Sequence, residues 1–473
     1  LAILESKERI RSCFKNIGLD FPVKRVLVNL SPADIKKKGS SFDLGIFLGI
    51  LSNIGKIRNI ENFKNYLILG EISLNGEVKS VKGAINATIL AKEKGIRGVI
   101  IPYENYDEAC LISGVEIVPV SRIEEAVSFL NGKISLDELH KSMKEKMNLK
   151  KNEKSKKNRE EKNVVDFSDV KGQFLAKRAM EIAAAGGHNI FLMGDPGSGK
   201  SMLAKRFVTI LPEMSEKEII ETTKIYSISG MLSPDKPVIT ERPFRAPHHS
   251  ATQTALVGGA IRAGEITLAL NGVFFMDELG EFGTRTLETL RQPLEDGNVT
   301  ISRANLIVNY PVNNIMIAAS NPTPGGFFQD DPQCKDSLRD IKNYQKKFSG
   351  PLLDRIDLYV EMRRLKKEEI FSECESESSE TVKERVIKAR EIQKKRFNED
   401  FLNGKMSRKQ ISEYCKIDSE TKKVLERAID ELKLSVRAYD KILKVSRTIA
   451  DLEGSKNIKT EHLLEALNYR KKY

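Results

Sequence analysis

The stretch Gly194-Asp195-Pro196-Gly197-Ser198-Gly199-Lys200-Ser201 decides the fold of this chain. It follows an apolar run at Asn189–Met193 and precedes a helical pattern that begins at Met202, which is the strand, loop and helix order of a phosphate-binding loop. Glycines let backbone N–H groups turn toward phosphate oxygens, and the helix N-terminus adds positive potential there. We expect Lys200 to reach the β- and γ-phosphates of ATP and the Ser201 hydroxyl to bind Mg²⁺. The alternative is a glycine-rich turn that binds nothing, and the complete spacing argues against it.

A second run, Val273–Met276, is apolar throughout and is followed by two carboxylates, Asp277 and Glu278. Four apolar residues predict a buried central strand, and open α/β sheets bind their ligands at the carboxyl ends of the strands. Asp277 is therefore placed to hold Mg²⁺ through water, and Glu278 to orient and polarise the attacking water. An acidic pair after a strand is weak evidence alone, but a phosphate-binding loop on the same chain makes it strong.

Two further polar positions complete the candidate site. A third strand at Asn314–Ala319 is followed by Asn321, whose amide can hydrogen-bond the γ-phosphate or the water; the alternative is a turn-forming Asn-Pro. Farther along, Gly350–Asp357 contains Arg355. An arginine outside the nucleotide's own pocket can reach the γ-phosphate held by a neighbouring subunit. Taken alone, Arg355 would be an ordinary surface residue.

Length, net charge and composition limit the class of protein to which this chain can belong. A chain of 473 residues predicts two to four domains, and its net charge of +12 suggests an anionic partner, with nucleic acid the leading candidate and lysine-rich solvation an equal alternative. Apolar runs are shorter than the ~18 residues that span a membrane, so no membrane partner is expected. The five cysteines are scattered and form no C-x-x-C pair, which fits a reducing cytosol and predicts a cytoplasmic protein.

The patterns divide the chain into four parts. Residues 1–132 alternate helix and strand signals and predict an α/β domain without a phosphate loop. Residues 133–165 are rich in Lys, Asn and Glu and predict a solvated basic linker, with nucleic-acid contact as the alternative. Residues 166–375 hold the phosphate-binding loop, and residues 376–473 read as all-helical.

The N-terminal part has readable local signals. The helices predicted from apolar spacing and caps are Ala2–Ile17, Phe42–Leu51, Ala84–Lys94 and a last helix to Leu130 opened by a capping box at Ser121-Arg122-Ile123-Glu124. The predicted strands are Arg25–Leu30, Gly98–Ile101 and Val115–Val118, together with a hairpin of Tyr66–Leu69 and Glu77–Val81 around Asn75-Gly76.

These motifs together resemble a known family. Those typical of AAA+ ATPases are Gly194–Ser201, Val273–Glu278, Asn321 and Leu352-Leu353-Asp354-Arg355. Those similar to the magnesium-chelatase-like branch are Asp166–Gln173, Ala183–Asn189 and Phe244–His249. Over nearly its whole length the chain resembles the ComM/YifB family. The resemblance implies a Lon protease-like α/β domain, an AAA+ P-loop α/β sandwich with a parallel sheet, and an all-α lid. The chain begins at Leu1 rather than Met, so a short segment of the family pattern is expected before it.

The resemblance also implies roles for residues beyond the phosphate loop. Asn321 would be sensor 1, Arg355 the finger that acts on a neighbouring subunit, and Arg437 the sensor 2 residue of the lid. Thr240–Leu270 would be an insertion in helix 2. Thr289–Val312 would contain a pre-sensor β-hairpin with Asn298–Arg303 near its tip, which makes Arg303 and the insertion candidate DNA contacts.

The chain departs from the family pattern at two places. Cysteine pairs that family members often carry after the sensor Asn-Pro are missing: the matching run is Thr323-Pro324-Gly325-Gly326, and Asp336 stands where a second cysteine is expected after Cys334. A four-thiolate zinc site is therefore not supported. In the N-terminal domain, Ser41 falls at the position of the protease nucleophile, but the helix after Gly83 begins Ala84-Ile85-Asn86-Ala87-Thr88 and lacks the lysine base. We expect a non-catalytic assembly or DNA-binding platform.

The pair His248-His249 is not explained by the nucleotide site. Adjacent histidines cannot face one direction in regular structure, and a metal site would need further ligands that the nearby sequence does not offer. A structural or pore-loop role is the expectation.

The resemblance and the motifs lead to one functional hypothesis. The chain is expected to be a cytosolic AAA+ ATPase that uses ATP and Mg²⁺ and assembles into a homo-oligomeric ring, which the resemblance implies is a hexamer. It is expected to move branched or single-stranded DNA as a branch-migration helicase in recombination. The alternative is a protein-remodelling or chelatase-type motor subunit that acts on a protein partner.

Overall fold

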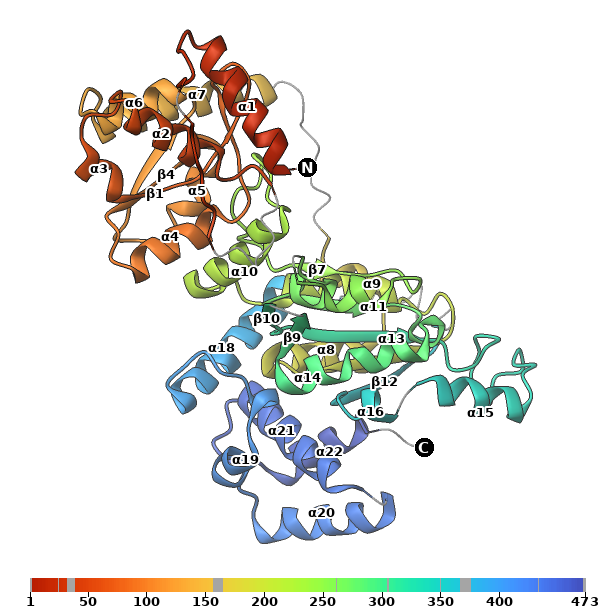
Figure 1. Ribbon diagram of the computed structural model, residues 1–473. Helices are drawn as coiled ribbons and strands as arrows, with labels where there is room; N and C mark the ends of the chain where they lie inside the picture. The colour runs from red at the N-terminus through yellow and green to blue at the C-terminus, as the bar shows by residue number, and fades with distance from the viewer. Residues whose placement is uncertain are drawn as a thin grey trace. The chain divides into compact units, whose positions relative to one another are not determined.

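The computed structural model describes residues 2–23, 25–31, 39–155, 165–260, 262–303, 306–348, 350–365, 376–432 and 434–470. The chain forms two compact units (Figure 1). The first comprises residues 1–162, 215–240 and 302–307, and the second comprises residues 163–214, 241–301 and 308–473.

The second unit is built on a five-stranded sheet in the order β12-β6-β11-β8-β7. Its strands are β6 (Ile190–Gly194), β7 (Phe244–Arg245), β8 (Val273–Met276), β11 (Ile315–Ser320) and β12 (Leu358–Met362). Every neighbouring pair is parallel. The residues of β6, β8 and β11 are all buried, as expected of a parallel sheet covered on both faces. The predicted AAA+-type α/β core with a parallel sheet is confirmed.

Short α-helices and 3-10 helices connect the strands of this sheet. The elements of this part are η2 (Phe167–Asp169), α8 (Phe174–Gly186), α9 (Lys200–Arg206), η3 (Phe207–Ile210), α11 (Gln253–Val257), α12 (Glu265–Leu268), η4 (Leu279–Glu281), α13 (Thr284–Thr289), α14 (Arg291–Asp296), α15 (Leu338–Lys347) and α16 (Gly350–Leu353). The strands β9 (Asn298–Arg303) and β10 (Leu306–Pro311) pair as a separate two-stranded sheet.

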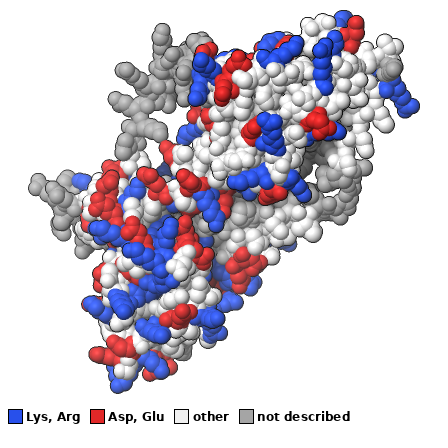
Figure 2. All heavy atoms as spheres, turned by 90° about the vertical axis from the view of Figure 1, so that its left-hand side faces the viewer, with Lys and Arg blue, Asp and Glu red and all other residues white. Residues whose placement is uncertain are grey.

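The C-terminal part is helical, as predicted. Its elements are α18 (Ser379–Phe397), η5 (Asn403–Lys405), α19 (Arg408–Tyr414), α20 (Ser419–Leu432), α21 (Val436–Leu452) and α22 (Thr460–Asn468). Lys and Arg side chains lie among Asp and Glu side chains on the face drawn in Figure 2, most densely toward the bottom of the view, where Figure 1 places α20. The basic excess of the chain is therefore not gathered into one uniform positive surface on this face.

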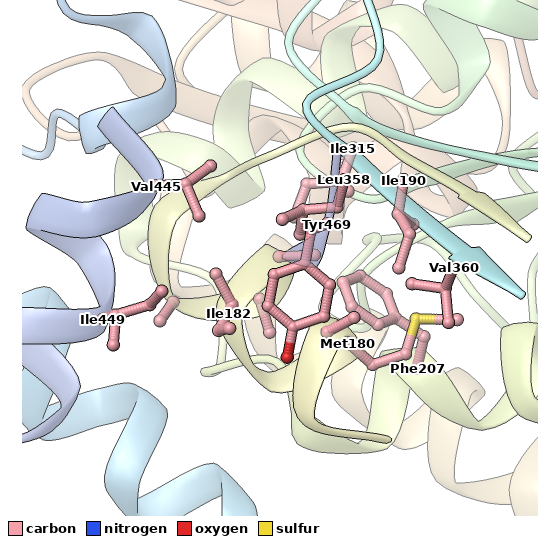
Figure 3. Close-up of a cluster of buried hydrophobic side chains, with 14 of the residues drawn as sticks. Met180, Ile182, Ile190, Phe207, Ile315, Leu358, Val360, Val445, Ile449 and Tyr469 are labelled. Atoms are coloured by element: carbon pink, nitrogen blue, oxygen red, sulfur yellow. The ribbon is translucent and has the colours of Figure 1, made fainter. Parts of the chain in front are cut away.

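One continuous core joins the sheet to the C-terminal helices. Met180 of α8, Ile190 of β6 and Val360 of β12 belong to the same buried cluster as Ile449 of α21 and Tyr469 (Figure 3). The backbone N–H of Tyr359 also donates to the carbonyl of Tyr469 over 2.8 Å. The helical part that was predicted as a separate lid therefore shares its hydrophobic core with the ATPase part.

The first unit contains a parallel sheet in the order β1-β4-β5 and a short antiparallel pair. Its strands are β1 (Tyr66–Ile68), β2 (Glu71–Ile72), β3 (Val78–Lys79), β4 (Gly98–Pro102) and β5 (Glu116–Val120). Its helices are α1 (Ala2–Asn16), α2 (Asp43–Asn53), α3 (Ile60–Lys64), α4 (Ala84–Glu93), η1 (Tyr103–Asn105), α5 (Tyr106–Ala109), α6 (Ile123–Leu130), α7 (Leu136–Ser155) and α10 (Glu216–Ser229). Most of the elements predicted for residues 1–132 are thus present.

Three local predictions are corrected. Arg25–Leu30 is not a strand, because its backbone pairs with no strand in the described part of the chain and Leu27 is 85% exposed. The Asn75-Gly76 hairpin joins β2 to β3, while Tyr66–Ile68 pairs with β4 in the parallel sheet. At the start of α6, Ser121 is capped by Glu125 rather than Glu124: the Ser121 N–H donates to Glu125 Oε2 over 2.7 Å, because the helix begins at Ile123.

The predicted linker is wrong over its first part. Residues Leu136–Ser155 form α7, and Leu139 and Met143 of that helix are buried. Lys146 also donates to Glu125 over 2.8 Å. These contacts make α7 part of the first unit, because its apolar positions recur at helical spacing despite the surrounding lysines. Residues 156–164 lie outside the described residues. No helix in the described part of the chain is long and apolar enough to cross a membrane.

Candidate active site

The phosphate-binding loop connects β6 to α9 at the carboxyl edge of the parallel sheet. Gly197 and Gly199 have φ angles of +79° and +93°, which only glycine adopts without strain. The Lys200 ammonium donates to the carbonyl oxygens of Gly194 over 2.5 Å and Asp195 over 2.9 Å. The loop is thus folded around the lysine in the form that the sequence predicts for a phosphate cradle.

Burial and nearby carboxylates shift the pKa of Lys200 in opposite directions. Burial lowers the pKa of its ammonium, and the charges of Asp277, Asp195 and Glu278 oppose that change. A cation surrounded by oxygen acceptors in a half-buried loop is suited to exchange those acceptors for phosphate oxygens.

Ser201 and Asp277 meet although 76 positions separate them in the sequence. The Ser201 hydroxyl donates to Asp277 Oδ2 over 2.6 Å, and the Glu278 N–H donates to Asp277 Oδ1 over 3.0 Å. β8 is buried along its whole length, which fixes the carboxylate beyond its end. A hydroxyl and a carboxylate oxygen side by side are the hard oxygen donors that suit Mg²⁺, which normally keeps several of its waters. The two residues therefore fit the ion that ATP-binding loops use.

Glu278 has an unusual backbone and an unpredicted neighbour. Its φ of +49° lies in the left-handed region, where a non-glycine residue is uncommon and is typical of functional sites. Its carboxylate is more than half exposed, and Glu278 Oε2 lies 3.2 Å from His249 Nδ1. The His249 ring also packs against the His248 ring, with the centroids 4.0 Å apart. His249 therefore belongs to the surroundings of the predicted water-polarising carboxylate, a contact that the sequence did not indicate.

The histidine pair forms no metal cluster in the described residues. The cluster of metal-ligating groups found there is Glu453, Glu461 and His462 in the C-terminal helices. His462 Nδ1 accepts a hydrogen bond from the Lys459 N–H over 3.0 Å, and His462 Nε2 lies 2.8 Å from a Glu453 oxygen. Both ring nitrogens are thus occupied by protein partners.

Asn321 lies beside the phosphate-binding loop. It follows β11, which runs between β6 and β8 in the sheet. Asn321 Oδ1 accepts from the Lys200 ammonium over 3.2 Å. The parallel register brings the carboxyl ends of three strands to one edge, and with them the predicted residues Lys200, Ser201, Asp277, Glu278 and Asn321.

Arg355 lies at the opposite end of the strands, before the start of β12, whereas the phosphate loop follows the end of β6. Leu358 is paired with Ile190, and Met362 is paired with Gly194, so β12 runs toward the phosphate loop and Arg355 precedes its start. Four steps along the strand separate these two pairs, which is about 13 Å at the usual rise of a strand. Arg437 lies on the same side as Arg355, because its guanidinium is 3.6 Å from Asp354. The predicted residues of the site are thus divided between two edges of one sheet.

The predicted insertion and hairpin are only partly as expected. Thr240–Leu270 includes Phe244–Arg245, which is the edge strand β7 of the core sheet and not an inserted segment. Asn298–Arg303 forms the whole first strand of the hairpin rather than its tip, and Arg303 is the last residue of that strand. Residues 304 and 305, between the strands, lie outside the described residues.

The run where family members often carry cysteines is held by a carboxylate. The Gly325 N–H donates to Asp336 Oδ2 over 2.8 Å, and the Gly326 N–H donates to the Thr323 hydroxyl over 3.2 Å. Asp336 thus closes this loop by a hydrogen bond.

Comparison with known proteins agrees with this fold. Residues 166–370 match the model of magnesium chelatase, subunit ChlI, residues 376–470 match its C-terminal domain, and residues 1–105 match a further ChlI model. A parallel sheet with a phosphate-binding loop after β6 and an acidic pair after β8, two strands away, matched by these models, defines an AAA+ protein of the magnesium-chelatase type.

More specifically, the chain belongs to the ComM/YifB family. It is 42% identical to the competence protein ComM of Haemophilus influenzae over 99% of this chain and 90% of that protein. It is 39% identical to YifB of Escherichia coli over 99% of this chain and 89% of that protein. A more distant match is the DNA replication licensing factor mcm6 of Dictyostelium discoideum, which is 24% identical over 59% of this chain and 27% of that protein.

Proposed function

We propose that this protein is an ATP-hydrolysing ring motor that acts on DNA, of the helicase type that promotes branch migration during recombination of incoming DNA. ATP and Mg²⁺ are the cofactors that its family and its phosphate loop imply. The cytosol is the proposed location, because the cysteines are scattered and those that the structure describes are free.

The proposed ring is supported by one observation: the predicted site residues are divided between the two ends of the strands of one sheet. Lys200 and Glu278 lie at the carboxyl edge, whereas Arg355 precedes β12 at the other edge. An arginine so placed cannot stabilise charge on a phosphate held by its own chain. In a closed ring with head-to-tail interfaces, however, the side of one subunit that carries Arg355 meets the side of the next subunit that carries the phosphate loop. A homo-oligomer, with six subunits as in the family pattern, would complete the site.

The DNA assignment rests on relatives and on charge. A relative that matches nearly all of the chain is named a competence protein, and a more distant one is named a DNA replication licensing factor. The net charge of +12 favours a polyanion, although basic and acidic side chains are mixed on the face in Figure 2. The β9–β10 hairpin, which carries Arg303, is the segment that we propose contacts DNA.

A second function is favoured by a different observation. The family models that match the chain are those of a magnesium chelatase subunit, so a motor that acts on a protein partner, by remodelling it or by serving a chelatase, is the alternative.

One experiment separates the two functions. ATP turnover of the assembled protein is measured with no DNA, with linear duplex and with a four-way junction, and with Lys200→Ala as the control that abolishes ATP binding. A DNA motor gives turnover that rises with junction DNA, and DNA binding that weakens steeply with salt because phosphate contacts release counterions. Turnover that no DNA changes, with a specific protein recovered from the lysate that stimulates it, would support the alternative.

A further inference from the structure

Arg355, the proposed finger, is held by an acidic residue of its own chain. Arg355 Nη2 donates to Glu295 Oε2, and the Arg355 side chain is only 11% exposed. Glu295 lies in α14, and about half of its side chain is exposed to solvent. The pair joins two segments that are 60 residues apart in the sequence.

The backbone around Arg355 is fixed independently of this ion pair. The Lys441 ammonium of α21 donates to the carbonyl of Asp354 over 2.5 Å and to that of Ile356 over 2.7 Å. The Asn189 side chain donates to the Arg355 carbonyl over 3.1 Å. Because the main chain is anchored on both sides, the guanidinium is the part of Arg355 that can change direction.

Glu295 lies at the base of the β9–β10 hairpin. α14 ends at Asp296 and is followed by Gly297, which has a φ of +66°, and β9 begins at the next residue. The Val312 N–H, just after β10, donates to the Gly297 carbonyl over 2.8 Å and closes the base of the hairpin. A movement of the hairpin about this base would therefore move the short helix that carries Glu295.

Glu295 is surrounded by cations and is therefore a carboxylate near neutral pH. The hydrogen bond from Arg355 lowers its pKa most, followed by the charge of that arginine, and Arg437 and Arg291 lower it further. Arg437 is itself 3.6 Å from Asp354. Arg355, the proposed finger, and Arg437, the predicted sensor 2 residue, thus share one acidic environment.

We propose that Glu295 is a positioning residue that holds Arg355 away from the nucleotide of the neighbouring subunit until the β9–β10 hairpin moves. This inference rests on the proposed function of Arg355 as a finger. While Nη2 of its guanidinium is directed to Glu295, the side chain is oriented toward its own chain, so the ion pair competes with contact to a γ-phosphate of the neighbouring subunit. DNA on the hairpin would displace Glu295 and release the finger toward the second copy of this chain.

The test is the turnover of ATP without DNA. Glu295→Gln removes the carboxylate charge and keeps the shape, so we expect DNA-free kcat to rise while KM for ATP stays unchanged. An ion pair whose carboxylate is about half exposed to solvent is weak, so the expected rise is about two- to fivefold. Asp296→Asn is the matched control, because it makes the same charge change one residue away and no ion pair among the described residues involves Asp296.

A double variant shows whether Glu295 acts through the finger. Glu295→Gln added to Arg355→Ala should leave turnover at the level of Arg355→Ala alone, because Glu295 can restrain turnover only when the Arg355 side chain is present. A DNA-free kcat of Glu295→Gln that equals or falls below that of the wild type would overturn the proposal. Because this readout needs no DNA, a wild-type protein that DNA does not stimulate would contradict the proposed function and leave the test of Glu295 intact.

Discussion

Replacing Arg355 with alanine should abolish ATP hydrolysis in a homo-oligomer and yet leave that subunit able to hydrolyse ATP beside a suitable neighbour. The reason is the register of the sheet: Leu358 pairs with Ile190, and Met362 pairs with Gly194. Arg355 is therefore separated from its own phosphate loop by at least the length of the strand, about 13 Å. A finger contributes about 10³–10⁵ in rate, so Arg355→Ala alone should be inactive in a standard turnover assay.

Mixing two inactive variants gives the decisive measurement. Arg355→Ala keeps an intact phosphate loop, and Lys200→Ala keeps an intact finger. In rings assembled at random from equal amounts, a working interface needs one Arg355→Ala subunit whose neighbour is Lys200→Ala. The fraction of such interfaces is the product of the two mole fractions, which is about one quarter for a closed ring of any size. We therefore expect up to about one quarter of wild-type turnover, with a parabolic dependence on the mixing ratio.

The outcome separates action on a neighbour from action within one chain. If Arg355 served the nucleotide of its own subunit, every subunit in the mixture would lack one essential group, and mixing would recover nothing. The control is the same mixture prepared from rings that are kept assembled and cannot exchange subunits, which should stay inactive. Full activity of the Arg355→Ala homo-oligomer would refute the finger assignment itself.

Three other perturbations follow from the geometry. Glu278→Gln should bind ATP normally and lose about 10²–10⁴ in kcat, since binding uses Lys200 while Glu278 acts on the water; nucleotide binding and single-turnover hydrolysis check this, and loss of binding would contradict it. Burial alone would raise the pKa of Asp357, but the His188 hydrogen bond and lysine charges lower it to about 2. Because the pKa of Asp357 is lower in the folded than in the unfolded chain, its carboxylate stabilises the fold above about pH 4, and this stabilisation is lost as the pH falls from about 4 to 2. Asp357→Asn should therefore lower the free energy of unfolding by about 2 kcal/mol near neutral pH and make it depend less on pH between about 4 and 2. Denaturant unfolding at several pH values measures this, and an unchanged pH dependence would contradict it. Arg303→Ala should weaken DNA binding, lower the slope of log K against log salt by about 1, and leave DNA-free turnover unchanged.

The C-terminal helices are packed into the ATPase part of the chain and contact the residue before β6 and the segment around Arg355. His188, just before β6, has its Nε2 2.8 Å from the Thr448 hydroxyl of α21 and its Nδ1 3.3 Å from Asp357 Oδ2. Lys441 of the same helix holds the carbonyls on both sides of Arg355. A shift of α21 would therefore act both on the start of β6, which leads to the phosphate loop, and on the backbone around Arg355.

The nucleotide edge could be predicted because its chemistry is local or fixed by strand ends. Gly194–Ser201 specifies its own backbone, since glycines permit the turn and the following helix supplies the N-terminus. Asp277 and Asn321 follow apolar runs, and parallel strands place such residues at one edge whatever the details of packing. The cytoplasmic location, the subunit number and the action on DNA came from resemblance and composition, and remain proposals.

The contacts made across long sequence separations were decided only by the tertiary structure. His249 beside Glu278 and Glu295 on Arg355 have no signature in the chain, because an exposed histidine or glutamate looks the same whether or not a partner folds against it. The strand predicted at Arg25–Leu30 failed for the same reason: β-branched residues favour an extended backbone, but a strand exists only where another strand accepts its hydrogen bonds. The sequence by itself determined which nucleotide chemistry this protein carries. The register of its sheet decided that the finger lies at the other edge, where the subunit's own phosphate loop is beyond its reach.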